Sequence, residues 1–106
     1  HRLAMTETLN QRDFITIPVS GTPVSLSDYL DSSSRWKHVH IGVSGGAVRW
    51  LAIANRSPGP NDGSYIGSGG ALDWSNPEVD YSGLIYNAKF VKAGAADAQL
   101  EVALFW

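Results

Sequence analysis

Two histidines, His38 and His40, come closest to forming a chemical site in this sequence of 106 residues. They lie in an alternating run, Trp36 to Val43, which predicts a β-strand. Side chains two positions apart on a strand point to the same face, so the two imidazoles could share a metal ion. No Asp or Glu follows between Ile41 and Trp50, and the only other histidine is His1. A metal ion would therefore need carboxylates from distant parts of the chain.

The histidine pair leaves two interpretations open. Cupin jelly rolls hold a metal with such a pair, but they add a carboxylate a few residues later and a third histidine from a later strand. The alternative places His38 and His40 on a partly solvated sheet face beside Trp36, a position that also suits a subunit interface. Because the sequence lacks both cupin additions, we predict neither a metal nor another cofactor.

The remaining catalytic patterns are incomplete. The chain has no cysteine, which excludes thiol catalysis, disulfides and Cys-ligated zinc. The segment Gly63 to Gly70 lacks the Lys-Ser/Thr ending of a phosphate-binding loop, and its Ser68 lacks the spacing of a nucleophile elbow. The acidic residues of this region are scattered: Asp62, Asp73, Glu78 and Asp80. Their spacing does not match a calcium-binding loop, and nothing in the sequence pairs two of them as the catalytic acids of a glycosidase. We therefore predict that the protein is not an enzyme.

Composition and charge narrow the classes of partner. The formal net charge of −2 and the lack of a basic run argue against a nucleic-acid surface. No apolar run reaches the roughly 20 residues that a membrane span requires. Eleven glycines and five prolines indicate many turns and short strands. A chain of this length forms one domain.

The pattern of apolar residues predicts an all-β fold. The stretch 36–54 is expected to be a central hairpin, because two apolar runs flank Ser44-Gly45-Gly46-Ala47. Pro18 predicts that the strand 13–20 lies at a sheet edge. Further strands are expected at 24–26, 65–66, 71–74, 84–91 and 98–106. We predict a single-domain antiparallel β-sandwich, jelly-roll-like, with seven to eight short strands over residues 13–106. Residues 1–12 are expected to be a flexible segment, of which 1–4 derive from an expression vector.

Aromatic residues are abundant: the sequence has four Trp, four Tyr and three Phe. Trp50 and Trp106 are expected in the core, since they lie in the most apolar strands. Four others lie at predicted strand ends or in loops, where exposed rings suit protein interfaces and sugar stacking alike; they are Trp36, Trp74, Tyr65 and Tyr81. The alternative is that these four rings pack at the periphery of the core, under loops.

The last predicted strand has an apolar residue on both faces. Its core face carries every second residue from Ala98 to Trp106, whereas Ala103 and Phe105 point outward. Such an outward apolar face predicts self-association. The residues predicted to bind a partner are Trp36, His38, His40, Tyr65, Trp74, Tyr81 and Phe105.

The chain resembles the small all-β accessory proteins of tailed bacteriophage virions, in particular capsid decoration or cement proteins. The likeness spans residues 14–106 and rests on the strand Ile15–Val19, a β-run punctuated by Gly and Ser, and the closing run Gly94–Trp106. It implies a jelly-roll-like sandwich on the outer capsid surface of the virion, without catalytic residues. The implied partners are the major capsid protein and further copies of this chain, as a dimer or trimer. A carbohydrate-binding sandwich that uses exposed aromatics is the alternative function.

Overall fold

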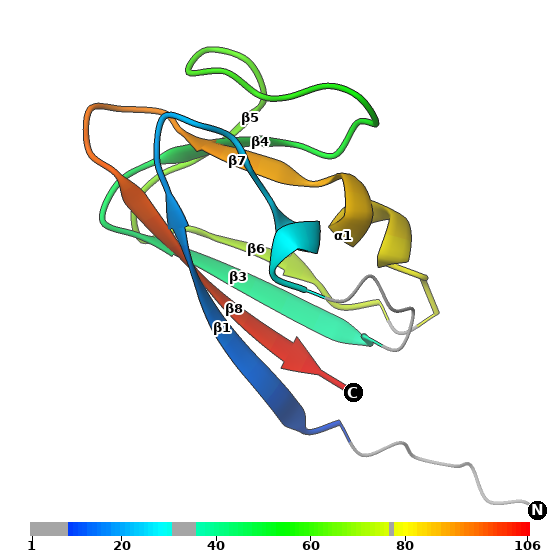
Figure 1. The fold of residues 1–106 in the computed structure, drawn as a ribbon. Helices are drawn as coiled ribbons and strands as arrows, with labels where there is room; N and C mark the ends of the chain where they lie inside the picture. The colour runs from blue at the N-terminus through cyan, green and yellow to red at the C-terminus, as the bar shows by residue number, and fades with distance from the viewer. Residues whose placement is uncertain (1–8, 31–35, 77) are drawn as a thin grey trace, which may run out of the picture.

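The computed structural model describes residues 9–30, 36–76 and 78–106. Eight strands form two four-stranded antiparallel sheets, which pack face to face with one short α-helix at one end (Figure 1). The predicted β-sandwich is therefore confirmed. The predicted flexible segment falls mostly on residues 1–8, and the vector-derived residues 1–4 lie there too, outside the described part of the chain.

The first sheet has the strand order β1-β8-β3-β6. Its strands are β1 (Gln11–Val19), β8 (Ala98–Phe105), β3 (His38–Ser44) and β6 (Ala71–Trp74). Strand β1 begins two residues before the predicted boundary and lies at the edge of the sheet, as Pro18 predicted. Backbone hydrogen bonds between Asn10 and Trp106 continue this pairing past the strand ends.

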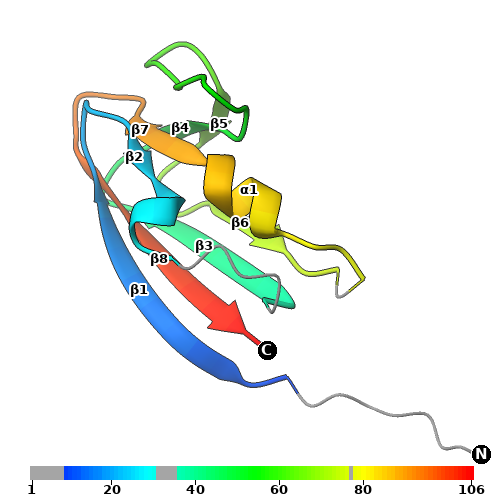
Figure 2. The same cartoon turned by 45° about the vertical axis from the view of Figure 1, so that its right-hand side comes forward.

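The second sheet has the strand order β2-β7-β4-β5. Its strands are β2 (Val24–Ser25), β7 (Lys89–Lys92), β4 (Val48–Leu51) and β5 (Ser64–Ile66). A 3₁₀ turn, η1 (Leu26–Asp28), follows β2, and helix α1 (Ser82–Asn87) precedes β7. Figure 2 shows η1 and α1 at the same end of the sandwich.

The strands pair in a nested pattern. β1 pairs with β8, β2 with β7, β3 with β6 and β4 with β5, all antiparallel. Two further pairings, β3 with β8 and β4 with β7, join these pairs into the two sheets. Each sheet therefore combines segments from both halves of the chain.

The core lies between the sheets and follows the alternation seen in the sequence. In β3 every second residue is buried, and β8 repeats the pattern with Leu100, Val102 and Leu104 fully buried. Phe90 of β7 is the largest fully buried side chain. Burial of apolar surface at about 25 cal/mol per Å² is the main stabilising term for such a core.

The predicted central hairpin is wrong in one respect. β3 and β4 do lie in the middle of their sheets, but they belong to different sheets and do not pair with each other. The connection Ser44–Ala47 crosses from one sheet to the other. Gly45 has a φ of 82°, a conformation that favours glycine. The Gly-Gly signal for a turn was correct, but the choice of pairing partners depends on residues far along the chain.

The predicted strand 84–91 is also partly wrong, because its first half is helix α1. Ile85 and Ala88 are buried on one side of this turn, and the Asp80 carboxylate accepts a hydrogen bond from the Ser82 N–H at the start of the helix. Alternation of apolar residues over such a short run does not separate a helical turn from a strand. Strand β7 begins only at Lys89.

Candidate functional site

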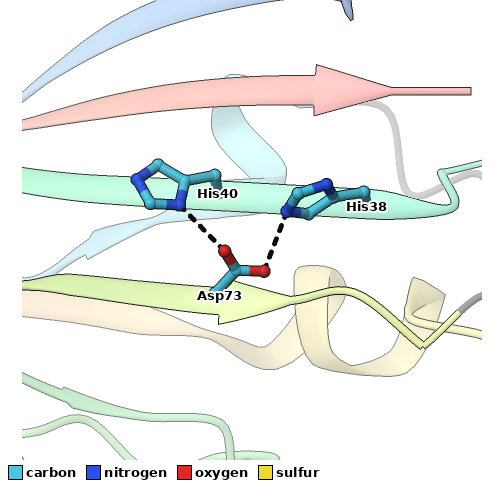
Figure 3. A group of neighbouring side chains, drawn as sticks. All are labelled: His38, His40 and Asp73. Atoms are coloured by element: carbon cyan, nitrogen blue, oxygen red, sulfur yellow. Dashed lines mark hydrogen bonds and ion pairs between the residues drawn. The ribbon is translucent and has the colours of Figure 1, made fainter. Parts of the chain in front are cut away.

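A cluster of two imidazoles and one carboxylate forms on the outer face of the first sheet. Val39, Ile41 and Val43 of β3 point into the core, so His38 and His40 point outward. The neighbouring strand β6 places Asp73 directly opposite His40 in the antiparallel register. Figure 3 shows the carboxylate of Asp73 between the two rings. We call His38, His40 and Asp73 the histidine–aspartate cluster.

The two carboxylate oxygens contact one imidazole each. His40 Nδ1 donates a hydrogen bond to Asp73 Oδ2 at 3.0 Å, and His38 Nε2 lies 2.8 Å from Asp73 Oδ1 (Figure 3). The side chains of His40 and Asp73 are each 45% exposed, and that of His38 is 29% exposed. The cluster is therefore accessible from solvent while its members hold one another in place.

The electrostatics of the cluster favour an ionised carboxylate. The hydrogen bond from His40 is the main cause that lowers the pKa of Asp73 below its ordinary 3.8; burial opposes this, and the nearby His38 adds to the lowering. Asp73 is therefore an anion at neutral pH, and it faces two nitrogen ligands. Such a set can bind a proton or a metal ion between its members.

Neighbouring residues define the surface around the cluster. The ring of Phe105 stacks on His38 with a centroid distance of 4.6 Å, which fixes the plane of that imidazole. Ala103 of β8 lies opposite His40, and Phe14 of β1 lies opposite Ala103. Phe14, Ala103, His40 and Asp73 therefore form one row across all four strands. The side chain of His40 stays 45% exposed beside the small Ala103.

The expectation that four aromatic rings are exposed is wrong for three of them. Trp36, Trp74 and Tyr81 are buried, and only Tyr65 is exposed. Trp36 packs edge-on against Trp106, and Trp74 stacks on Tyr81. These contacts match the alternative given above, in which the rings pack at the periphery of the core. Binding of a partner by these three rings stays a prediction, but their faces are not presented to solvent.

The predicted core positions of the other two tryptophans are close to the observed ones. Trp50 and Trp106 are partly buried and pack against the core cluster. Trp50 stacks on Phe90 with a centroid distance of 6.0 Å. Tyr65, on β5, carries the guanidinium of Arg49 over its ring at 5.0 Å. The guanidinium of Arg49 therefore already contacts one face of the exposed ring of Tyr65.

Two residues of functional interest were not identified from the sequence. Asp73 appeared there only as one of several scattered acids, because nothing local shows that β6 pairs with β3. Tyr86 was expected on a strand, but it projects from α1 and is exposed. It borders a shallow hollow lined by Ser25, Ser27, Ala54, Asn55, Asn87 and Lys89.

Comparison with known proteins does not identify a relative of this chain. No family model, curated protein or solved structure matches this chain. Neither described helix is long and apolar enough to cross a lipid bilayer.

Proposed function

We propose that this protein is a capsid decoration protein: a jelly-roll sandwich that binds the outer surface of a phage capsid and stabilises contacts between capsomers. It acts by binding alone and catalyses no reaction. The nested pairing of eight strands into sheets β1-β8-β3-β6 and β2-β7-β4-β5 supports the jelly-roll assignment. Jelly rolls with eight strands in two sheets serve as viral capsid domains, lectins and cupins.

The fold alone does not choose among these classes, because one fold carries many functions. The resemblance of residues 14–106 to virion accessory proteins favours the capsid class. A protein of that class needs a broad surface that can lie against a shell of other proteins. The outer face of the first sheet has this character, since its residues are mostly small or uncharged.

Exposed Phe14 is the observation that carries the proposal. Phe14 is 55% exposed on the outer face of β1, opposite Ala103 in the register and in the same row as His40. Exposure of a large apolar ring to water is unfavourable in a free monomer, and burial of the ring against a partner would stabilise the complex. Aromatic residues of this kind are the usual anchors of protein interfaces.

The outer edge of β1 offers a second means of attachment. Within the described residues, this nine-residue strand pairs only with β8, so the backbone groups along its other edge are available. Pro18 near one end and the irregularity between Gln11 and Asp13 near the other limit open-ended pairing. The segment between them, around Phe14, is left for strand addition by a capsid protein or by another copy of the chain.

Cosedimentation with capsid shells tests this proposal. Shells assembled from the major capsid protein of the same phage should bind the chain at fixed stoichiometry, whereas Phe14→Ser should weaken binding by roughly tenfold or more, as expected for an interface anchor. Light scattering on the free chain should show a dimer or trimer. The melting temperature should change little, because Phe14 lies outside the core.

Tyr86→Ser is the matched control. It also removes an exposed aromatic ring, but from α1 rather than from the first sheet. Equal shell binding by the Phe14 and Tyr86 variants would reject the proposed docking face. Failure of the unmodified chain to bind any shell would reject the capsid function itself.

Carbohydrate binding is the second candidate, and the hollow beside Tyr86 is the observation that favours it. Tyr86 is 65% exposed, and amide and hydroxyl groups of Asn55, Asn87 and Ser27 line the hollow next to it. A flat ring beside such groups suits a sugar. A glycan array distinguishes the two functions: binding that Tyr86→Ser abolishes and Phe14→Ser leaves intact would favour the carbohydrate function.

A further inference from the structure

We propose that His38, His40 and Asp73 bind a divalent transition-metal ion of the zinc class on the outer face of the first sheet. The proposal does not depend on the capsid function. It reverses the expectation drawn from the sequence, because the carboxylate missing after His40 is supplied by β6. The cluster is the one group of histidines and acids within the described residues whose ligand atoms converge, all within 4.8 Å of one another.

The two separations between imidazole nitrogen and carboxylate oxygen are close to those that a metal requires, and all the ligand atoms lie within 4.8 Å of one another. Zn–N and Zn–O bonds of about 2.0–2.2 Å in a tetrahedron place ligand atoms roughly 3.3–3.5 Å apart. The carboxylate oxygens lie 2.8 and 3.0 Å from the two imidazole nitrogens. A withdrawal of the Asp73 carboxylate by roughly half an ångström would therefore bring both of these separations into the range of a metal site. Asp73 sits near the end of a short strand at the sheet edge, where such a movement disturbs little.

His38 supplies a second observation. Its Nε2 is shielded from solvent, yet within the described residues it makes no properly directed hydrogen bond. Its one close polar contact is the 2.8 Å ion pair with Asp73 Oδ1, and the same imidazole contributes to the lowered pKa of that carboxyl group. The contact with Asp73 partly compensates the burial of this nitrogen, and a metal ion bonded to its lone pair would satisfy it fully. Stacking of Phe105 on the ring holds this nitrogen toward the cluster.

The ligand types indicate which ion binds. Two imidazoles and one carboxylate suit zinc and its first-row neighbours, whereas magnesium and calcium prefer oxygen ligands alone. Three protein ligands leave a further coordination position, which faces solvent because His40 and Asp73 are each 45% exposed. Glu101 of β8 lies on the same face with its carboxylate over Gly42, and it adds negative charge that attracts a cation.

Zinc titration of the metal-depleted chain of 106 residues tests the proposal. Calorimetry should show one zinc ion per chain, and magnesium should produce no heat. Cobalt should give the visible absorption bands of a low-coordinate site. In nitrogen NMR of the imidazole rings, zinc should shift His38 Nε2 and His40 Nδ1 in the unmodified protein. This last measurement reports on the site without any substitution.

Three variants assign the ion to the cluster. Asp73→Asn keeps the size of the side chain and removes the charge, and it should weaken zinc binding by roughly 10- to 100-fold, since even partners outside the coordination shell are worth that much. His38→Ala combined with His40→Ala should abolish binding. Asp97→Asn is the matched control, because Asp97 is an exposed acid paired with Lys92 on the β7–β8 turn; it should leave binding unchanged.

Two results would overturn the proposal. The first is zinc binding that survives the double histidine substitution and disappears with His1→Ala, which would place the ion at the start of the chain. The second is zinc-induced NMR shifts that leave both His38 and His40 unaffected. Melting temperatures of all variants show whether each one is folded, and the NMR result stands even if a variant is not.

Discussion

Gly46 lies directly against the carbonyl oxygen of Ala96. A Cβ atom placed on Gly46 would lie 2.7 Å from that oxygen and 3.1 Å from the carbonyl oxygen of Asp97. The connection between β3 and β4 is therefore packed backbone to backbone against the turn between β7 and β8. These two turns connect the two sheets at the same end of the sandwich, and only a residue without a side chain allows their close approach.

Gly46→Ala should lower the free energy of unfolding by about 1–3 kcal/mol, because the added methyl group forces two backbones apart. Chemical denaturation followed by tryptophan fluorescence measures this change. Gly94→Ala is the control: its Cβ would meet nothing within 4 Å, so stability should change by less than about 0.5 kcal/mol. Equal losses in the two variants would contradict this account of the turn.

Gly83→Ala should stabilise the protein. Gly83 lies in helix α1, and a Cβ there would have no neighbour within 4 Å. Alanine in a helix is favoured over glycine by about 0.5–1 kcal/mol, chiefly because alanine loses less backbone conformational entropy than glycine when the chain folds. The melting temperature should rise. A decrease would indicate that α1 is not helical in solution.

Tyr81→Phe should destabilise the protein by about 0.5–1.5 kcal/mol, the usual value of one hydrogen bond. The Tyr81 hydroxyl accepts a hydrogen bond from the Asn76 N–H, and the ring is buried against Trp74. Denaturation experiments measure the loss, with Tyr86→Phe as the control, because Tyr86 is exposed. If both substitutions are neutral, the hydroxyl of Tyr81 does not stabilise the loop before α1.

Acid should remove the contribution of Asp80. The Ser82 backbone N–H donates to its carboxylate at 2.9 Å, and this hydrogen bond is the main cause that lowers the pKa of Asp80 below 3.8. Because the pKa of Asp80 is lower in the folded protein than in the unfolded chain, its stabilisation is complete above the unfolded-state pKa of about 3.9. The stabilisation is lost as the pH falls through the folded-state pKa.

The melting temperatures of the unmodified protein and Asp80→Ala test this expectation. Their difference should be constant from about pH 7 to pH 5 and should shrink as the pH falls below about 4. A difference that stays constant down to about pH 2.5 would show that the carboxylate charge is not what stabilises the start of α1.

The sequence was informative where burial imposes a period of two. The faces of β1, β3 and β8 could be assigned from alternation alone, as could the edge position of β1 from Pro18. It was misleading where a short apolar run fits two structures, as in residues 84–91, and where a glycine turn could either fold back or cross between sheets. Local residues specify a turn, but they do not specify which strand lies beside it.

The histidine–aspartate cluster shows the same limit. The spacing of His38 and His40 placed both rings on one face, but Asp73 could be added only once the register between β3 and β6 was known. The sequence also did not indicate that three aromatic residues are buried, namely Trp36, Trp74 and Tyr81. Residues at strand ends look alike in sequence whether or not a loop covers them.

The position of β8 in the first sheet affects how the protein is made. This strand is the last of the eight to leave the ribosome, yet it lies between β1 and β3 and pairs with both. During translation, 78 residues separate the end of β1 at Val19 from the start of its partner at Ala98. Until β8 is made, the edges of β1 and β3 that it will cover lack their hydrogen-bond partners and are open to other nascent chains. Slow elongation or a premature stop before Ala98 should send the product to chaperones and aggregates rather than to a partly folded intermediate.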